Sequence, residues 1–513
     1  MLFNSYAFIF LFLPLTLFVF FRISRSSHRL AALWLAAASL FFYGWWNPKF
    51  ALLLLASIAG NYAAGYVIGH ARARQVAIAN RRRILTLAIA TNLLLLAYFK
   101  YANFFISTVT EVIGGHAPMI NVVLPLGISF FTFTQIAFLV DVHRGCAREY
   151  NLIHYLLFVT YFPHLIAGPV LHHKQMMPQF GFSRTYRPNV GNIALGLSVF
   201  AIGLFKKVIL ADQFALYANP VFDAVGGGAQ PQLFEAWCGA LAYTLQLYFD
   251  FSGYSDMAIG LSRMFNVVLP INFNSPYKAE SIIDFWRRWH ITLSTFLRDY
   301  LYIPLGGNRR GPVRRYGNMM TTMLLGGLWH GANWTFVLWG GLHGVYLIIN
   351  HAWIGLSTYL RLPDVPGARL LSRLLTFLAV VMAWVPFRAN SIATAERMLS
   401  AMVGKNGISL PERLEPLIGP LLGGSVSFGG LAPLAALPQR DLAIWLVTGL
   451  SVVWLLPNAQ QWIGESARTC TIAGSARLLT WRPHVGWGVV VGMLLGVSLL
   501  GLTRESQFLY FQF

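Results

Sequence analysis

The segment Phe285–His290 reads FWRRWH, and the segment Gly327–Ala332 reads GLWHGA. Between His290 and His330 the chain is rich in arginine, whereas after His330 it becomes apolar again. This order predicts a basic segment at the cytoplasmic face of a membrane, followed by a histidine inside the membrane. The rest of the sequence has to explain why a histidine is placed there.

The composition is that of a polytopic membrane protein. Of 513 residues, 56% are hydrophobic and 11% are charged, whereas soluble domains are about 25% charged. Many apolar runs approach the ~20 residues that a spanning helix needs. We therefore predict an all-α fold, an integral membrane helical bundle with about 10–12 spans or part-spans.

The predicted spans alternate with basic loops. They are Ala7–Phe21, Leu30–Trp46, Phe50–Ile68, Ile84–Phe99, Leu124–Val140, Ile193–Leu210, Leu233–Phe249, Gly317–Leu328, Trp334–Ile349, Leu371–Val385, Leu442–Leu456 and Val485–Leu502. Tyr161–Pro169 contains Pro and Gly and is predicted to be re-entrant or a half-helix. The aromatic tail Phe508–Phe513 ends the chain.

The net charge of +20 could indicate nucleic-acid binding. However, the arginines lie between apolar runs, as they do in cytoplasmic loops, so we do not predict a nucleic-acid partner. Arginines follow the first span and the third, which places both loops in the cytoplasm and the N-terminus outside. Cys146, Cys238 and Cys470 have neither metal-like spacing nor an evident disulfide pattern, and packing is their predicted role.

Asp250 and Asp256 lie in a segment that Gly and Ser are expected to break. Two carboxylates could bind a metal, but hard cations generally take more oxygen ligands. We predict instead that these carboxylates cap broken helix ends, and we predict no metal site.

Thirteen helical steps from Gly317 place His330 roughly 20 Å into the membrane, near the middle of a hydrocarbon core about 30 Å thick. An ionisable residue at this depth is a functional candidate, and imidazole can act as a base. The alternative is a structural histidine that hydrogen-bonds between helices. For His290 the alternative is an interfacial histidine.

Arginine is abundant in Glu280–Tyr316, which we call the basic segment. Arg287, Arg288 and Arg298 could bind the phosphate of an acyl donor, because guanidinium groups grip phosphate bidentately. Ordinary positive-inside charge with anionic lipid contact is the alternative. The sequence contains no nucleophile elbow, Walker loop or dinucleotide fingerprint, which disfavours hydrolase, ATPase and redox activities.

The chain resembles the membrane-bound O-acyltransferase family, and most closely its bacterial branch of alginate and other polysaccharide O-acetylases. The motifs that carry this resemblance span most of the chain. They are Leu124–Phe130, Leu165–Pro169, Gly203–Lys207, Asp250–Asp256, Asn274–Tyr277, Phe285–His290, Tyr302–Gly307, Trp329–Gly331 and Trp384–Arg388. Phe162–His164 departs from the Phe-Phe-Pro-Gln motif that is common in the family, which leaves the local contacts of this loop open.

The resemblance implies that His330 is the essential histidine, buried in a central tunnel, and that His290 is its partner. Other branches carry Asn or Asp at the partner position, which suggests an orienting role. The resemblance also implies one membrane-embedded domain over residues 1–513. Its expected parts are peripheral helices (1–120), a catalytic core (121–390), and a loop with closing helices (391–513).

The implied activity is acetyl transfer from cytoplasmic acetyl-CoA across a bacterial inner membrane, with no bound cofactor. The acetyl group would pass to an extracytoplasmic acetyltransferase partner that modifies a polysaccharide such as alginate. One alternative is D-alanyl transfer from a carrier-protein thioester to a cell-wall polymer. A second is a non-enzymatic polysaccharide or lipid exporter, which the largely apolar spans disfavour.

Overall fold

The computed structural model describes residues 1–73, 77–115, 117–147, 151–166, 168–361, 366–410, 415–422, 426–428, 439–464 and 481–503. Within these ranges the protein is helical, and extended backbone pairs only in an isolated bridge between Ser409 and Ser427. The all-α prediction is therefore confirmed. Cys470 and the aromatic tail Phe508–Phe513 lie outside the described residues.

The chain divides into two compact units. Unit 1 comprises the described parts of Met1–Leu204, Tyr254–Asn272 and Trp481–Glu505. Unit 2 comprises those of Phe205–Gly253, Phe273–Thr480 and Ser506–Phe513. The long helix α12 (Leu233–Met264) supplies residues to both units.

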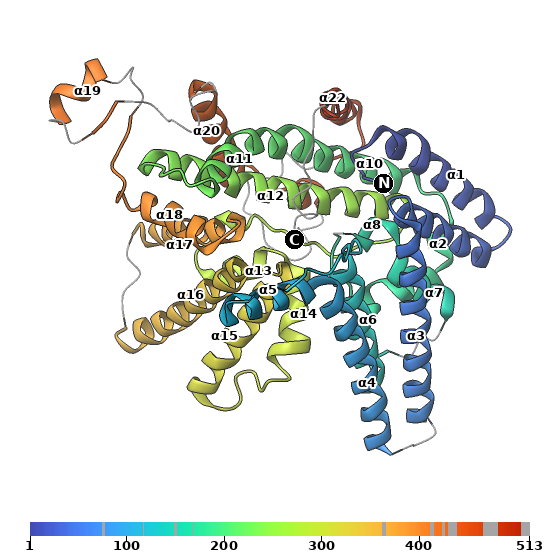
Figure 1. The fold of residues 1–513 in the computed structure, drawn as a ribbon. Coiled ribbons are helices and arrows are strands. Elements are labelled where there is room, and N and C mark those ends of the chain that lie inside the picture. Colours follow the sequence, from blue (N-terminus) through green and yellow to red (C-terminus); the bar gives the residue numbers. More distant parts are fainter. Residues whose placement is uncertain are drawn as a thin grey trace. The chain divides into compact units, whose positions relative to one another are not determined.

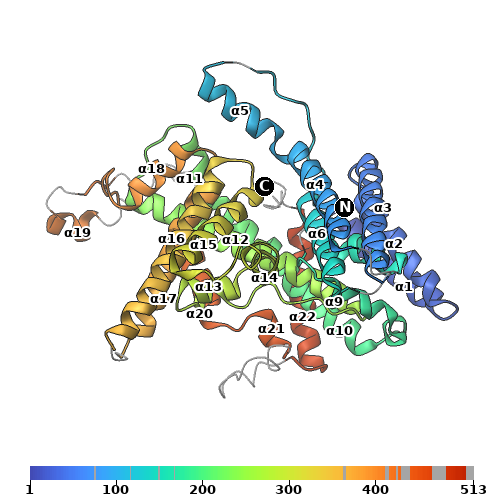
Figure 2. The same cartoon turned by 90° about the horizontal axis from the view of Figure 1, so that it is seen from below.

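Unit 1 is built from the N-terminal helices. They are η1 (Ala7–Phe12), α1 (Leu13–Ser24), α2 (His28–Gly44), α3 (Pro48–Ala73), α4 (Ile78–Leu96), η2 (Ala97–Tyr101), α5 (Ala102–Ile113), α6 (Ile128–Arg144), α7 (Leu152–Thr160), α8 (Phe162–Leu165), α9 (His173–Met176), η3 (Met177–Gly181), η4 (Ser183–Tyr186) and most of α10 (Val190–Phe205), together with α22 (Val485–Gly501). Helices α3, α4 and α6 pack side by side (Figures 1 and 2). The predicted interruption within Tyr161–Pro169 is present, because α7 ends at Thr160 and the short α8 follows.

Unit 2 contains the remaining helices. They are η5 (Lys206–Ala211), α11 (Asp212–Gly226), η6 (Pro276–Lys278), α13 (Ile282–Arg288), α14 (Ile291–Leu297), η7 (Arg298–Tyr302), α15 (Gly311–His330), α16 (Trp334–Tyr359), α17 (Ala368–Arg388), α18 (Ile392–Met402), α19 (Glu415–Leu422), α20 (Gln439–Leu455) and α21 (Ala459–Trp462). Helices α15, α16 and α17 lie in sequence beside one another (Figures 1 and 2). Both histidines of the opening motifs belong to this unit.

Long apolar helices confirm a polytopic membrane protein. Among the described residues, the segments long and apolar enough to cross a membrane are Ala7–Ser24, Pro48–Arg72, Ile78–Ile113, Val190–Gly226 and Ala368–Arg388. Asp441–Leu455 and Val485–Gly501 are shorter apolar helices. The predicted spans Leu233–Phe249 and Gly317–Leu328 lie in α12 and α15, which are not among these segments and which include charged side chains.

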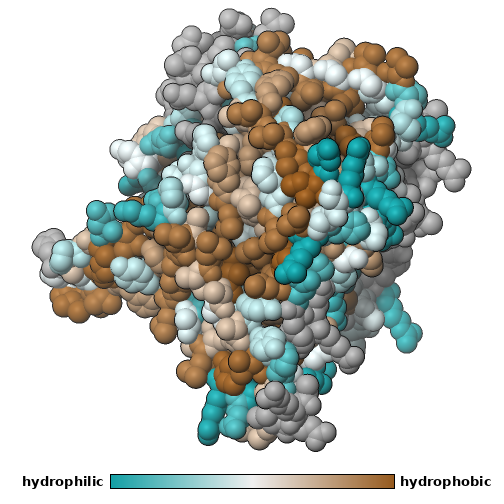
Figure 3. Space-filling view, turned by 90° about the vertical axis from the view of Figure 1, so that its right-hand side faces the viewer, coloured by the Kyte–Doolittle hydropathy of each residue, from teal (hydrophilic) through white to brown (hydrophobic). Residues whose placement is uncertain are grey.

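Exposed apolar side chains fit a lipid-facing surface. Phe10, Leu11 and Phe18 are each more than 60% exposed although they belong to an apolar span. On the face drawn in Figure 3, hydrophobic side chains cover broad areas between hydrophilic patches. Apolar exposure on this scale is costly in water but favourable in hydrocarbon.

The predicted break at Asp250–Asp256 is wrong. Helix α12 continues through this segment to Met264. Within unit 2, Lys207 Nζ forms ion pairs with Asp250 Oδ1 at 2.6 Å and with Asp212 Oδ1 at 2.7 Å. A helical glycine costs only about 1 kcal/mol, and burial of this helix outweighs that cost. Asp250 therefore balances a buried lysine and does not cap a helix end.

Candidate active site

His330 ends helix α15, and close packing of α15 on α16 sets its position. A Cβ atom at Gly327 would lie 2.2 Å from the Phe336 carbonyl oxygen, and one at Gly340 would lie 2.3 Å from the Met323 carbonyl oxygen. Both positions must therefore be glycine for the two helices to approach this closely. The extended backbone at Gly331 stops α15 immediately after His330.

His290 lies at a sharp turn between α13 and α14. Its backbone is left-handed, with φ 42° and ψ 53°, a conformation that costs a non-glycine residue roughly 1–3 kcal/mol. The Trp289 N–H donates to the Phe285 carbonyl, and the Ser294 N–H donates to the His290 carbonyl. The turn thus ends one helix, starts the next, and directs the imidazole into the core of unit 2, where it is fully buried.

The structure brings the two predicted histidines together. Their ring centroids are 6.4 Å apart, and His330 is only 7% exposed. Phe251 contacts His290 edge-on at 4.8 Å, while Trp339 and Phe387 contact His330 at 5.1 and 5.3 Å. One small substrate group that lies beside both imidazoles could contact both of them.

His290 is neutral at physiological pH. It lies in the turn between α13 and α14, outside the candidate membrane spans. Burial lowers the pKa of His290 to about 3, because the charged imidazolium loses its hydration. A neutral imidazole has one N–H donor and one acceptor nitrogen, so this residue suits hydrogen bonding to a substrate better than carrying a charge.

A family model described as "MBOAT, membrane-bound O-acyltransferase family" matches residues 76–365, a range that contains both histidines. The chain belongs to the membrane-bound O-acyltransferase family. It is accordingly an O-acyltransferase embedded in a membrane.

Two curated relatives are similar over most of this O-acyltransferase, and a third matches less than half of it. A peptidoglycan O-acetyltransferase of Helicobacter pylori is 44% identical over 80% of the chain and 81% of its own length. A probable alginate O-acetylase of Azotobacter vinelandii is 40% identical over 100% of both chains. A teichoic acid D-alanyltransferase of Streptococcus thermophilus is 28% identical over 45% of the chain and 57% of its own length.

The three predicted phosphate-binding arginines of the O-acyltransferase differ in their partners. Arg288 Nε lies 2.9 Å from Asp284 in the same helix, and Arg298 Nε lies 2.7 Å from Asp299. Arg287 is exposed at the end of α13. A donor phosphate would have to compete with a carboxylate at the first two positions, whereas Arg287 offers its charge to solvent.

Sequence reasoning missed that aromatic side chains of α16 extend the O-acyltransferase site. Trp339 touches His330, and the fully buried His343 touches Trp339 at 4.9 Å between ring centroids. The two residues are four positions apart, so they share one face of a helix. This spacing, together with the Trp329–His330 pair, was the available signal.

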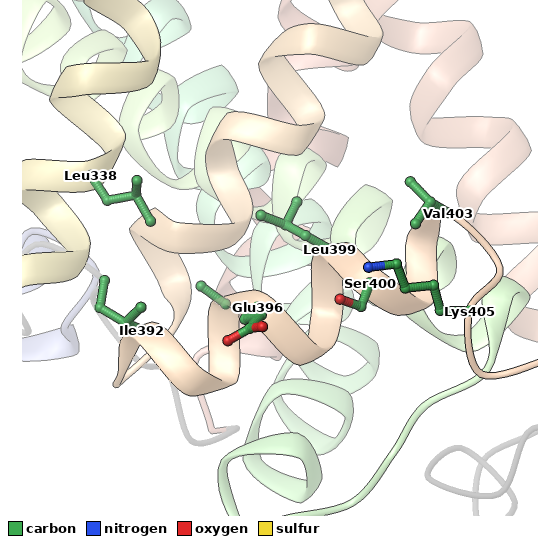
Figure 4. Close-up of a pocket in the computed structure, with 8 residues that line it drawn as sticks. Leu338, Ile392, Glu396, Leu399, Ser400, Val403 and Lys405 are labelled. Atoms are coloured by element: carbon green, nitrogen blue, oxygen red, sulfur yellow. The ribbon is translucent and has the colours of Figure 1, made fainter.

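An open groove lies elsewhere in unit 2 of the O-acyltransferase, between α16 and α18. It has a volume of about 380 Å³, and its lining is largely apolar (Figure 4). The lining residues are Leu338 of α16, then Ile392, Ala395, Glu396, Leu399 and Ser400 of α18, and Val403 and Lys405 after it. None of the predicted site residues lines it. The candidate chemistry therefore belongs to the buried histidines and not to this groove.

Proposed function

We propose that this O-acyltransferase moves an acetyl group from acetyl-CoA toward a hydroxyl group of an extracytoplasmic polysaccharide. The names of its H. pylori and A. vinelandii relatives, an O-acetyltransferase and an O-acetylase, support acetyl as the transferred group. The observation that carries the proposal is the 6.4 Å separation of two buried imidazoles in a chain of this family.

In the proposed reaction His330 is the general base. It removes the proton of the acceptor hydroxyl while the oxygen attacks the thioester carbonyl carbon, which forms the new C–O bond. The C–S bond then breaks, and the proton passes from His330 to the leaving thiolate. His290, as a neutral donor, stabilises the negative charge that develops on the carbonyl oxygen. Protons balance within the two substrates, so no further proton acceptor is required.

The donor is proposed to enter from the cytoplasm, past Arg287, Arg288 and Arg298 of the basic segment. Positive charge there favours the phosphates of the donor. The positive-inside rule supports this orientation in a bacterial inner membrane, with the N-terminus outside. The acceptor side is proposed to be extracytoplasmic, where an acetyltransferase partner passes the group to a polysaccharide such as alginate or peptidoglycan.

D-alanyl transfer from a carrier protein is the competing reaction. The relative with that name is less similar and covers less of the chain, which favours acetyl transfer. Purified protein in nanodiscs is incubated, with an oligosaccharide that offers acceptor hydroxyl groups, separately with radiolabelled acetyl-CoA and with labelled D-alanyl carrier protein. Release of thiol from acetyl-CoA alone supports the proposal, and turnover of the D-alanyl donor alone contradicts it.

His330→Ala tests the role of the base. We expect the variant to accumulate in the membrane as wild type does and to lose polysaccharide O-acetylation, by at least about 10²-fold, because general base catalysis contributes 10²–10⁴. The matched control is His70→Ala on α3 in unit 1, which should keep wild-type activity. O-acetylation at the wild-type level in His330→Ala would remove the basis of the proposal.

A further inference from the structure

His343 is a buried imidazole that the proposed reaction does not use. It is fully buried, and neither of its ring nitrogens has a hydrogen-bond partner in the part of the chain that the structure describes. A buried polar atom left unpaired costs about 1–3 kcal/mol. Each such atom in a folded protein calls for an explanation, and here two of them belong to one side chain.

Two tryptophans next to His343 also have a buried polar atom without a hydrogen-bond partner among the described residues. The indole N–H groups of Trp286 and Trp339 are buried and have no hydrogen-bond partner among the described residues. Their rings lie 5.1 and 4.9 Å from that of His343, and 5.8 Å from each other. We call Trp286, Trp339 and His343 the Trp–His cluster.

The hydrogen-bonding inventory of the Trp–His cluster is specific. Each indole offers one donor, and a neutral imidazole offers one donor and one acceptor. The cluster therefore has three donors and one acceptor, all without charge. The carbonyl oxygen of an amide can accept from two of these donors, and its N–H can donate to the one acceptor, whereas a cation or a hydrocarbon chain cannot do both.

The cluster connects the basic segment with the reaction centre. Trp286 directly precedes Arg287 in α13, His343 contacts Trp286, and Trp339 contacts both His343 and His330. The cluster thus shares α13 with Arg287 and Arg288 and contacts His330, which is where the middle of a donor bound at both places is expected. The donor arm of acyl-CoA and of acyl carrier proteins carries amide groups between phosphate and sulfur.

We propose that the Trp–His cluster binds an amide of the pantetheine-type arm of the acyl donor, with His343 and Trp286 as its specificity-determining residues. This inference rests on the proposed acyl-transfer function. It predicts that the cluster recognises the arm and not the acyl group. Acyl-CoA and acyl carrier proteins should therefore make the same contacts with it.

The test compares two donors with the same thioester, acetyl-pantetheine, which has amides, and S-propyl thioacetate, which has none. Thiol release by the full-length protein in nanodiscs, at a fixed concentration of an oligosaccharide acceptor, gives kcat/KM for each donor. The ratio of the two values cancels any loss of folded enzyme. We expect His343→Phe to lower this ratio about tenfold and Trp286→Phe several-fold, because one or two hydrogen bonds are lost. His343→Gln, which keeps a donor and an acceptor, should recover most of the ratio.

Phe285→Leu is the matched control, because Phe285 stacks on His343 at 5.9 Å without offering a polar atom. Its ratio should stay at the wild-type value. Binding of free pantetheine, measured by calorimetry, is a second readout that needs no turnover, and His343→Phe should weaken it by a similar factor. An unchanged ratio and unchanged pantetheine binding in His343→Phe and Trp286→Phe would overturn the inference.

Failure of the proposed function looks different, since wild-type protein would then release thiol from neither acetyl donor. Repeating the comparison with acetyl-CoA and with an acetyl carrier protein separates the two sources of the arm. The better substrate of the wild-type protein identifies the source, and the His343→Phe effect should appear with either one.

Discussion

His290 occupies a backbone conformation that most side chains avoid, and it does so beside another buried histidine. Strain of this kind persists where the surroundings over-determine it, and functional sites are common among such places. Asparagine tolerates the left-handed region better than alanine does, and its amide can donate a hydrogen bond. The residue therefore allows its backbone and side-chain contributions to be separated.

We expect His290→Asn to keep more activity than His290→Ala. The amide of Asn can replace the proposed N–H donor to the thioester carbonyl, whereas Ala removes the donor and strains the turn. Loss of one such donor typically costs about 10²–10³ in kcat. Thiol release from acetyl-CoA measures both variants, and equal activities would argue against hydrogen bonding by this side chain.

The buried ion pairs of Lys207 lead to a second prediction at the scale of a residue. Its Nζ is held between Asp212 and Asp250, and its side chain is 2% exposed. Lys207→Met would remove the cation that pairs with Asp212 and Asp250 inside the protein, and breaking a buried ion pair typically costs about 3–5 kcal/mol. The melting temperature in detergent should fall sharply for Lys207→Met and only slightly for the neighbouring Lys206→Met. Similar melting temperatures for the two variants would contradict a buried ion-pair role.

At the scale of elements, the α15–α16 hairpin depends on two glycines. Side chains at Gly327 and Gly340 would overlap the backbone of the facing helix. A Cβ at either position would push the helices apart, and we expect this to shift His330 relative to His290. Close packing of α15 on α16 thus sets the position of His330 in the candidate site.

Gly327→Ala and Gly340→Ala should each destabilise the protein by about 1–3 kcal/mol through overpacking and reduce acetyl transfer. Gly317→Ala on α15 and Gly355→Ala on α16 are matched controls, because a Cβ at either position meets nothing within 4 Å. Melting temperature and thiol release are measured together. Wild-type values in all four variants would show that close approach is not required.

At the scale of the whole molecule, the distribution of arginines predicts how the chain is oriented across the membrane. The proposed topology places the loop after α1 in the cytoplasm and the turn between α2 and α3 outside. Arg25 is exposed just after α1, and Lys49 is exposed at the start of α3, next to the second connection. Single cysteines at these positions report the side that each one faces.

In a background without Cys146, Cys238 and Cys470, we expect Lys49→Cys to react with a membrane-impermeant maleimide in intact cells. Arg25→Cys should react only after the inner membrane is permeabilised. The opposite pattern would invert the topology and move the proposed donor entry to the outer face.

The sequence alone predicted that its apolar segments are helices and that they lie in a membrane. The length of an apolar run is a local property, which does not depend on contacts with other parts of the chain. The predicted span Trp334–Ile349 lies within α16, and Val485–Leu502 differs from α22 by a single residue. The same apolar pattern predicted that Leu371–Val385 belongs to a membrane helix, now the core of α17. The motifs also singled out His290 and His330, since each stands in an unusual aromatic context.

Only the tertiary structure decided which of these residues meet. A separation of 40 positions between His290 and His330 does not determine distance. Their contact depends on the turn at His290 and on the glycine packing of α15 against α16. The continuity of α12 and the burial of Lys207 were likewise invisible, because partners distant in sequence outweigh local helix-breaking tendencies and compensate buried charge. The sequence by itself pointed to His290 and His330 as the candidate reacting groups, and the packing of unit 2 placed their rings side by side.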